Sequence, residues 1–173
     1  HPDINKIAFT GSTDVGKQIA KSCAASGKRL TLELGGKSPN IIFADAAIDQ
    51  AIEGIVQGIW FNQGHVCCAG SRLFVEESIL PEVLAKLDLR MKSLRVGDPL
   101  DKNTDIGAIN SLQQLTTIRR YLQEGAKEGC TLCQPGQREM PAKGYWCTPT
   151  YMTGVQPSHV VAREEIFGPV LAV

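Results

Sequence analysis

The start of the chain alternates between short apolar runs and glycine-rich turns in an order that leaves few folds open. Residues 6–10 (KIAFT) and 29–34 (RLTLEL) have the composition of strands, and a third such run follows at residues 40–43. Between the first two lies a segment with helical periodicity that runs to Ala24. Strands joined by a helix in this way form a βαβ unit, whose strands are parallel and whose crossover is right-handed. We therefore predict an α/β protein with a parallel sheet.

The turn after the first strand, residues 11–17 (GSTDVGK), has the composition of an anion site. Ser12, Thr13 or Asp14 can cap the following helix, whose free N–H groups and positive dipole end face the same point. The turn matches the start of the P-loop pattern, but Gln18 replaces the hydroxyl that would hold magnesium. It also departs from the dinucleotide fingerprint, because Thr13 replaces the second glycine. A turn without a ligand, a dinucleotide site and a P-loop nucleotide site all stay open on these residues.

A carboxylate stands at the end of the second strand. Glu33 lies in an apolar run directly before Gly35 and Gly36. Ligands of parallel sheets gather at the carboxyl ends of the strands. Glu33 is therefore either a paired structural charge or a general base whose pKa is raised by burial.

A pair of cysteines stands in the turn formed by residues 61–72 (FNQGHVCCAGSR). The turn follows a helical apolar stripe that ends near Ile59 and precedes a short strand-like run. Gly64 lets the backbone come close to a sulfur and to the group that it attacks. Cys67 or Cys68 is thus a candidate nucleophile, although free cysteines often act only as small apolar residues. His65 lies close enough in sequence to tune a thiol.

Composition argues against several classes of protein. Lysine plus arginine (18) balances aspartate plus glutamate (18), so no basic surface for nucleic acid or an anionic membrane is expected. No apolar run approaches the roughly 20 residues of a transmembrane helix, and the N-terminus has no signal-type pattern. We expect a cytoplasmic protein, with the mitochondrial matrix as the alternative, and reduced cysteines.

A C-x-x-C pair raises the question of zinc. Cys147 and His159 are conceivable further ligands of a metal bound by Cys130 and Cys133. Zinc sites usually show two paired ligand clusters. A single pair favours a strand with two buried thiols, so no metal is expected.

Four motifs together resemble the aldehyde dehydrogenase superfamily and follow one another in the order of that family. They are G-S-T-x-x-G at residues 11–16, E-L-G-G-K-S-P at 33–39, F-N-Q-G-x-x-C at 61–67 and E-E-I-F-G-P-V at 164–170. The resemblance implies a parallel-sheet remnant of a Rossmann-like NAD(P)-binding domain, residues 1–35. An α/β catalytic domain, residues 36–173, would follow and be truncated at its C-terminus. The chain would be the middle-to-late portion of a longer protein that forms a homo-oligomer.

The same resemblance implies an NAD(P)-dependent oxidation of an aldehyde to a carboxylic acid. Cys67 would be the nucleophile that forms a thiohemiacetal and then a thioester, and Glu33 would activate the water that hydrolyses the thioester. Glu165 would bond the ribose on the nicotinamide side, and Phe167 would pack near that ring. The other cofactor-binding residues implied are Gly11, Ser12, Val15, Gly16 and Leu34.

Some properties stay open on the sequence. The isolated chain is expected to be inactive, because the resemblance covers only part of the family's length. A non-catalytic interaction module and a P-loop-like nucleotide binder are the rival functions. Neither the aldehyde nor the choice between NAD and NADP follows from these residues.

Overall fold

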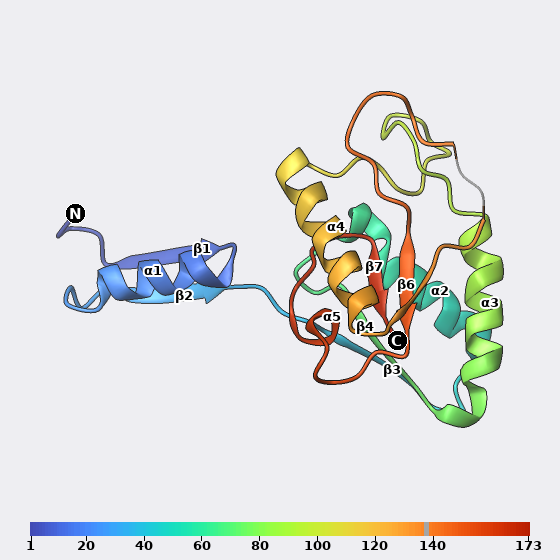
Figure 1. Cartoon of the computed structure of the whole chain (residues 1–173). Coiled ribbons are helices and arrows are strands. Elements are labelled where there is room, and N and C mark those ends of the chain that lie inside the picture. Colours follow the sequence, from blue (N-terminus) through green and yellow to red (C-terminus); the bar gives the residue numbers. More distant parts are fainter. Residues whose placement is uncertain (137–138) are drawn as a thin grey trace. The chain divides into compact units, whose positions relative to one another are not determined.

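The computed structural model describes residues 1–136 and 139–173, and the chain forms two compact units, His1–Gly36 and Lys37–Val173 (Figure 1). Each unit has its own sheet. The division falls inside the E-L-G-G-K-S-P motif, so Glu33 belongs to the first unit and Lys37 to the second.

The first unit is a single strand–helix–strand motif. Its elements are β1 (Lys6–Thr10), α1 (Thr13–Cys23) and β2 (Arg29–Glu33). The strands pair in parallel from Lys6↔Arg29 to Thr10↔Glu33, which confirms the predicted βαβ order. Helix α1 begins after Ser12, whose hydroxyl accepts a hydrogen bond from the Val15 N–H at 3.4 Å.

The second unit holds a five-stranded sheet with helices on both faces. Its strands are β3 (Pro39–Ile42), β4 (Arg72–Val75), β5 (Thr131–Cys133), β6 (Thr150–Thr153) and β7 (Val170–Ala172). Its helices and helical turns are α2 (Ile48–Ile59), η1 (Phe61–Gly64), η2 (Glu77–Ile79), α3 (Leu80–Lys92), α4 (Leu112–Lys127) and α5 (Val160–Arg163).

The strand order in this sheet is β3-β4-β7-β6-β5. All neighbouring pairs are parallel except β5 and β6, which are antiparallel. The antiparallel strand lies at the edge, as is common in sheets that are otherwise parallel. The predicted α/β class with a parallel sheet is therefore confirmed.

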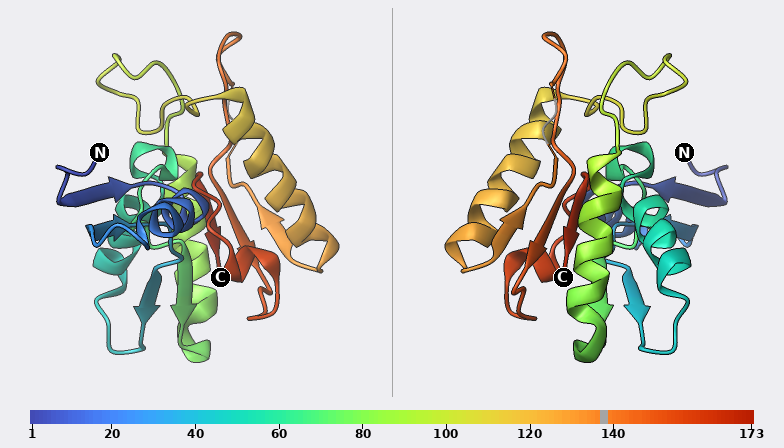
Figure 2. Two further views of the ribbon diagram at one scale, coloured as in Figure 1. Left: turned by 90° about the vertical axis from the view of Figure 1, so that its left-hand side faces the viewer. Right: turned by 90° about the vertical axis from the view of Figure 1, so that its right-hand side faces the viewer.

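Alternation along the strands divides the core of the second unit into two clusters. Tyr151 and Leu171 belong to the cluster that also contains side chains of α2 and α3. Their neighbours Met152 and Val170 belong to the cluster with α4 and α5. Successive strand residues point to opposite faces, so α2 and α3 cover one face and α4 covers the other, as Figure 2 shows.

The predicted apolar stripe of α2 forms part of the first cluster. Its members Ile52, Ile55 and Ile59 are buried, and they anchor the helix whose end leads into the cysteine turn. Within the part of the chain that the structure describes, no helix combines the length and apolar character needed to cross a membrane.

Candidate active site

The cysteine turn leads from the end of α2, through η1, to the start of β4. Cys67 and Cys68 are both exposed, so either thiol can be reached from solvent. The turn is closed by two backbone hydrogen bonds, from the Ala69 N–H to the Val66 carbonyl at 3.1 Å and from the Gly70 N–H to the Gly58 carbonyl at 2.9 Å. The thiols therefore lie on an ordered support beside a buried helix.

Three consecutive residues before the thiols have left-handed backbone conformations. These are Asn62 (φ 48°), Gln63 (φ 58°) and Gly64 (φ 73°). The conformation is unfavourable for glutamine and tolerable for asparagine, so surrounding contacts must hold it. The Asn62 amide donates to the His65 carbonyl at 3.1 Å. The Gln63 side-chain oxygen accepts a bond from the Gly107 N–H, also at 3.1 Å.

The cysteine turn packs directly on the E-E-I-F-G-P-V motif. A Cβ atom on Gly64 would lie 2.1 Å from the Gly168 carbonyl oxygen, so only glycine fits there. The indole N–H of buried Trp60 donates to the Pro169 carbonyl at 3.1 Å. Two motifs that are far apart in sequence are thus one contiguous structure.

Phe167, on the other side of this contact, also has a strained backbone. Its φ is 54°, a left-handed value that is uncommon for a bulky side chain. The side-chain amide of Gln114 in α4 donates to the Ile166 carbonyl at 2.8 Å and to the Phe167 carbonyl at 3.0 Å. Gln114 has no signal in the sequence that marks this role, because nothing in its polar helical surroundings distinguishes it.

The His65 ring packs against Phe167. Its ring centroid is 5.4 Å from that of Phe167, with the planes inclined by 43°. Among the described residues neither ring nitrogen has a hydrogen-bond partner, and both nitrogens are buried. Burial lowers the pKa of His65 from its ordinary value, which favours the neutral imidazole. Among the described residues, His65 therefore makes no side-chain hydrogen bond through which it could tune a thiol.

A buried lysine lies at the start of the same unit. Only 9% of Lys37 is exposed, and its ammonium has no hydrogen-bond partner among the described residues. Burial and the charge of Arg72 lower the pKa of Lys37 to about 8, while Glu165 acts in the opposite direction. The Arg72 N–H donates to the Ser38 carbonyl at 3.1 Å, which joins the strand after the thiols to the segment after Lys37. The three charged groups form one electrostatic cluster.

The first unit gathers its candidate residues at the carboxyl end of its two strands. Thr10 and Glu33 are partners in register, and the Gly11 N–H donates to the Glu33 carbonyl at 3.0 Å. The Glu33 side chain is exposed within this unit, as are Gly11, Ser12 and Val15. The predicted turn residues and the predicted base thus share one edge of a small parallel sheet.

Close packing fixes α1 on this edge. A Cβ atom on Gly16 would lie 2.5 Å from a methyl carbon of Leu34, so the helix approaches β2 closely. Only Gly11 and Ser12 separate β1 from α1. A P-loop needs a longer turn whose N–H groups surround a phosphate before the helix begins. The geometry therefore disfavours the P-loop hypothesis.

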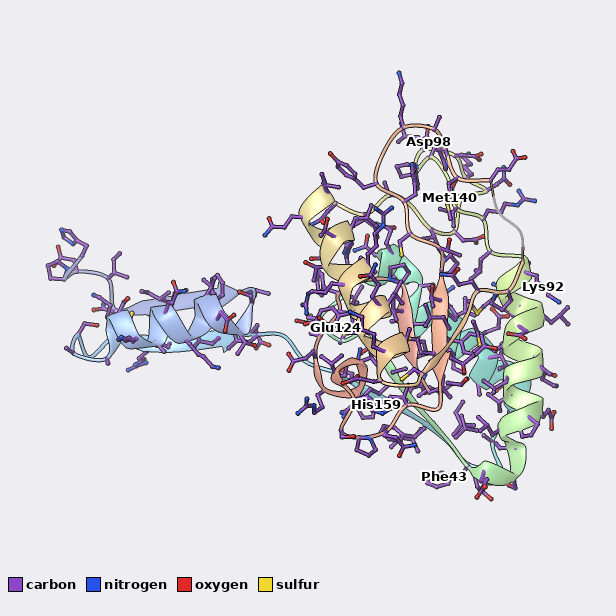
Figure 3. The ribbon with its side chains drawn as sticks, in the orientation of Figure 1. Phe43, Lys92, Asp98, Glu124, Met140 and His159 are labelled. Atoms are coloured by element: carbon purple, nitrogen blue, oxygen red, sulfur yellow. The ribbon has the colours of Figure 1, made fainter. Side chains whose placement is uncertain are left out.

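The C-x-x-C pair lies on and beside β5, where a strand was predicted. Cys130 is buried and its sulfur is 3.1 Å from Nδ1 of His159, which also accepts a bond from the Gln156 N–H (His159 is labelled in Figure 3). Cys133 is partly buried. The described ranges, 1–136 and 139–173, contain no cluster of three or more potential metal ligands.

Comparison with known proteins gives matches over the entire chain. The model of the aldehyde dehydrogenase family matches residues 1–173. The cytosolic 10-formyltetrahydrofolate dehydrogenase of Pongo abelii is 46% identical over 174 aligned residues, which cover 100% of this chain and 19% of that protein.

Solved structures match the fold as closely. The NAD-dependent aldehyde dehydrogenase from Sinorhizobium meliloti has a TM-score of 0.95 at 41% identity and covers 99% of this chain and 34% of that one. The NAD+ complex of an aldehyde dehydrogenase from Bacillus cereus has a TM-score of 0.93 at 43% identity, over 99% and 35% of the two chains. The chain therefore spans about a third or less of the length of these relatives.

Proposed function

The chain belongs to the aldehyde dehydrogenase family, and on this premise we propose that the complete protein oxidises an aldehyde to a carboxylic acid with NAD or NADP, with Cys67 as nucleophile and Glu33 as general base. The observation that carries the proposal is the packing of Gly64 on Gly168. This contact joins the thiol turn to the loop with Glu165 and Phe167, so a nucleophile and a pair of candidate cofactor contacts share one rigid support.

Cys67 begins the proposed reaction. Its thiolate adds to the carbonyl carbon of the aldehyde, which forms a C–S bond and moves the carbonyl π electron pair onto oxygen. The exposed turn leaves the thiol open to an incoming aldehyde. The Cys67 N–H would be one donor to the oxyanion. Collapse of the alkoxide restores the C=O bond and releases the aldehyde hydrogen with its electron pair. A thioester remains on Cys67.

Residues of both units fit a dinucleotide. In the first unit, the exposed Gly11 and Ser12 at the start of α1 suit a pyrophosphate, and Val15 presents an apolar surface for adenine. Leu34 and Gly16 hold the helix against the strand behind this surface. In the second unit, the Glu165 carboxylate suits a ribose hydroxyl and Phe167 suits a planar ring. The nicotinamide, when bound, supplies the two-electron acceptor for the hydride.

Glu33 completes the proposed cycle. It takes a proton from a water molecule that attacks the thioester carbonyl. The C–S bond then breaks, its electron pair returns to the Cys67 sulfur, and the carboxylic acid leaves. Glu33 and Cys67 belong to different units, so their meeting in one pocket is itself part of the proposal.

The neighbouring cysteine supplies a matched control for the test. In the complete protein, Cys67→Ala is expected to lower NADH or NADPH formation by at least about a thousandfold, because no other group forms the thioester. Cys68→Ala is expected to retain activity within about threefold, because Cys68 is also exposed but takes no part in the proposed thioester. Iodoacetamide should label Cys67, and NAD should protect it, as mapped by mass spectrometry.

The same test separates the rival functions. Full activity in Cys67→Ala would refute the assigned nucleophile. A complete protein that forms no NADH or NADPH with any aldehyde, and whose cysteine labelling is indifferent to NAD, would instead be the non-catalytic interaction module. We infer NAD as the first cofactor to try, because the Sinorhizobium relative is named NAD-dependent and the Bacillus relative was solved with NAD+. A homo-oligomer in the cytoplasm or the mitochondrial matrix is part of the same proposal.

A further inference from the structure

A pair of rings links the thiol turn to Phe167. The His65 and Phe167 centroids are 5.4 Å apart with a tilted arrangement, inside the range in which aromatic side chains attract each other. His65 stands two positions before Cys67, and Phe167 two positions after Glu165. The pair therefore connects the proposed nucleophile with the proposed nicotinamide contacts.

The ring pair lies beside a fixed main-chain contact. Gly64 precedes His65 and Gly168 follows Phe167, and these two glycines leave no space for a Cβ atom between them. The two backbones are thus held in contact one residue away from the rings. Small movements of either loop would therefore change the ring separation directly.

The Phe167 side chain needs a packing contact to hold its ring in one orientation. Its backbone is left-handed and is held by Gln114 through the Ile166 and Phe167 carbonyls. Those bonds fix the main chain but do not fix the side-chain torsions. Phe167 as a residue is 36% exposed, and the His65 ring packs against its side chain.

We propose that His65 is a positioning residue that holds the Phe167 ring by packing, and so sets where the nicotinamide end of the cofactor lies relative to Cys67. This inference rests on the proposed function. The His65 nitrogens make no hydrogen bond among the described residues, so the ring acts through its faces and edges. The neutral state expected from its burial fits this role better than that of an acid or base.

Three variants of the complete protein test the packing role. His65→Ala removes the ring, His65→Phe keeps an aromatic ring without nitrogens, and His65→Gln keeps polarity without aromaticity. Loss of one aromatic pair should raise the Kd of NAD about two- to tenfold in His65→Ala and His65→Gln. His65→Phe should restore the Kd to within about twofold, because the packing is kept. The Kd of ADP, which lacks the nicotinamide and its ribose, should stay unchanged in all three.

The rate of iodoacetamide alkylation at Cys67 as a function of pH separates packing from acid–base action. All three variants should keep the pH midpoint of the parent protein. A midpoint that shifts equally in His65→Ala and His65→Phe would overturn the proposal in favour of a direct effect on the thiol. An unchanged Kd for NAD in both His65→Ala and His65→Gln would also overturn it. If His65→Ala fails to fold, His65→Gln and His65→Phe carry the comparison.

Cys67→Ala, measured alongside, keeps the two proposals apart. If Cys67→Ala is inactive and the His65 variants bind NAD like the parent, only the positioning role is wrong. If Cys67→Ala is fully active, the proposed function itself is wrong.

Discussion

A methyl group on Gly64 has no room between the thiol turn and Gly168. The added Cβ would lie 2.1 Å from the Gly168 carbonyl oxygen and 2.4 Å from its carbonyl carbon. Both neighbours are backbone atoms, so no side-chain rotation can relieve the overlap. In Gly64→Ala, either the turn or the loop must move.

The energetic cost has two sources. Alanine in the left-handed conformation of Gly64 (φ 73°) costs about 1–2 kcal/mol. Overpacking of a tight contact costs typically about 1–3 kcal/mol. Movement of the turn relieves part of both, so we expect the free energy of unfolding to fall by about 2–4 kcal/mol. A displacement near 1 Å of the thiol relative to Phe167 should also lower aldehyde oxidation roughly a hundredfold.

Urea unfolding followed by tryptophan fluorescence suits this measurement. Trp60 is buried and donates to the Pro169 carbonyl, so its emission reports on the same contact. Gly54→Ala is the matched control, because Gly54 lies inside α2 and a Cβ there meets no atom within 4 Å. Alanine is a better helix former than glycine, so the control should be unchanged or up to about 1 kcal/mol more stable.

If Gly64→Ala unfolds at the same urea concentration as Gly54→Ala and alkylates Cys67 at the same rate, the turn is not held against Gly168. The contact that carries the proposed function would then not control the position of the thiol.

Two further predictions concern groups that hold or border the same loop. Gln114→Ala removes two hydrogen bonds to the Ile166 and Phe167 carbonyls, so the free energy of unfolding should fall by about 1–3 kcal/mol and NAD should bind more weakly. Gln113→Ala, an exposed neighbour on α4, is the control and should behave as the parent in urea unfolding and NAD titration. Lys37 has a folded pKa of about 8 against 10.5 as its ordinary value, so between these pH values the unfolded chain binds more protons than the folded one. The free energy of unfolding should therefore rise with pH from about 8 towards 10.5. Urea unfolding of Lys37→Met across that range should show a smaller rise in this free energy. An equal rise in both proteins would contradict the burial of the Lys37 ammonium.

Local patterns in the sequence were sufficient for the first βαβ unit, for the apolar stripe of α2 and for the general class of the fold. The periodicity of residues 6–34 predicted the parallel βαβ unit, because helical and strand periods are properties of neighbouring residues. The apolar stripe of α2 predicted which side chains are buried for the same reason. Motif order indicated the family, which the match over residues 1–173 confirms.

The contacts between distant segments were decided by the tertiary structure alone. No local pattern predicts that Gly64 lies on Gly168, that Gln114 holds the Phe167 loop, or that the Lys37 ammonium is buried without a partner among the described residues. Gln63 shows the physical reason most clearly. Its intrinsic preference opposes a left-handed backbone, and the bond from the Gly107 N–H helps to hold it there. The sequence by itself determined which residues could carry out the chemistry, and long-range packing determined which of them meet, because only packing can overcome local preference.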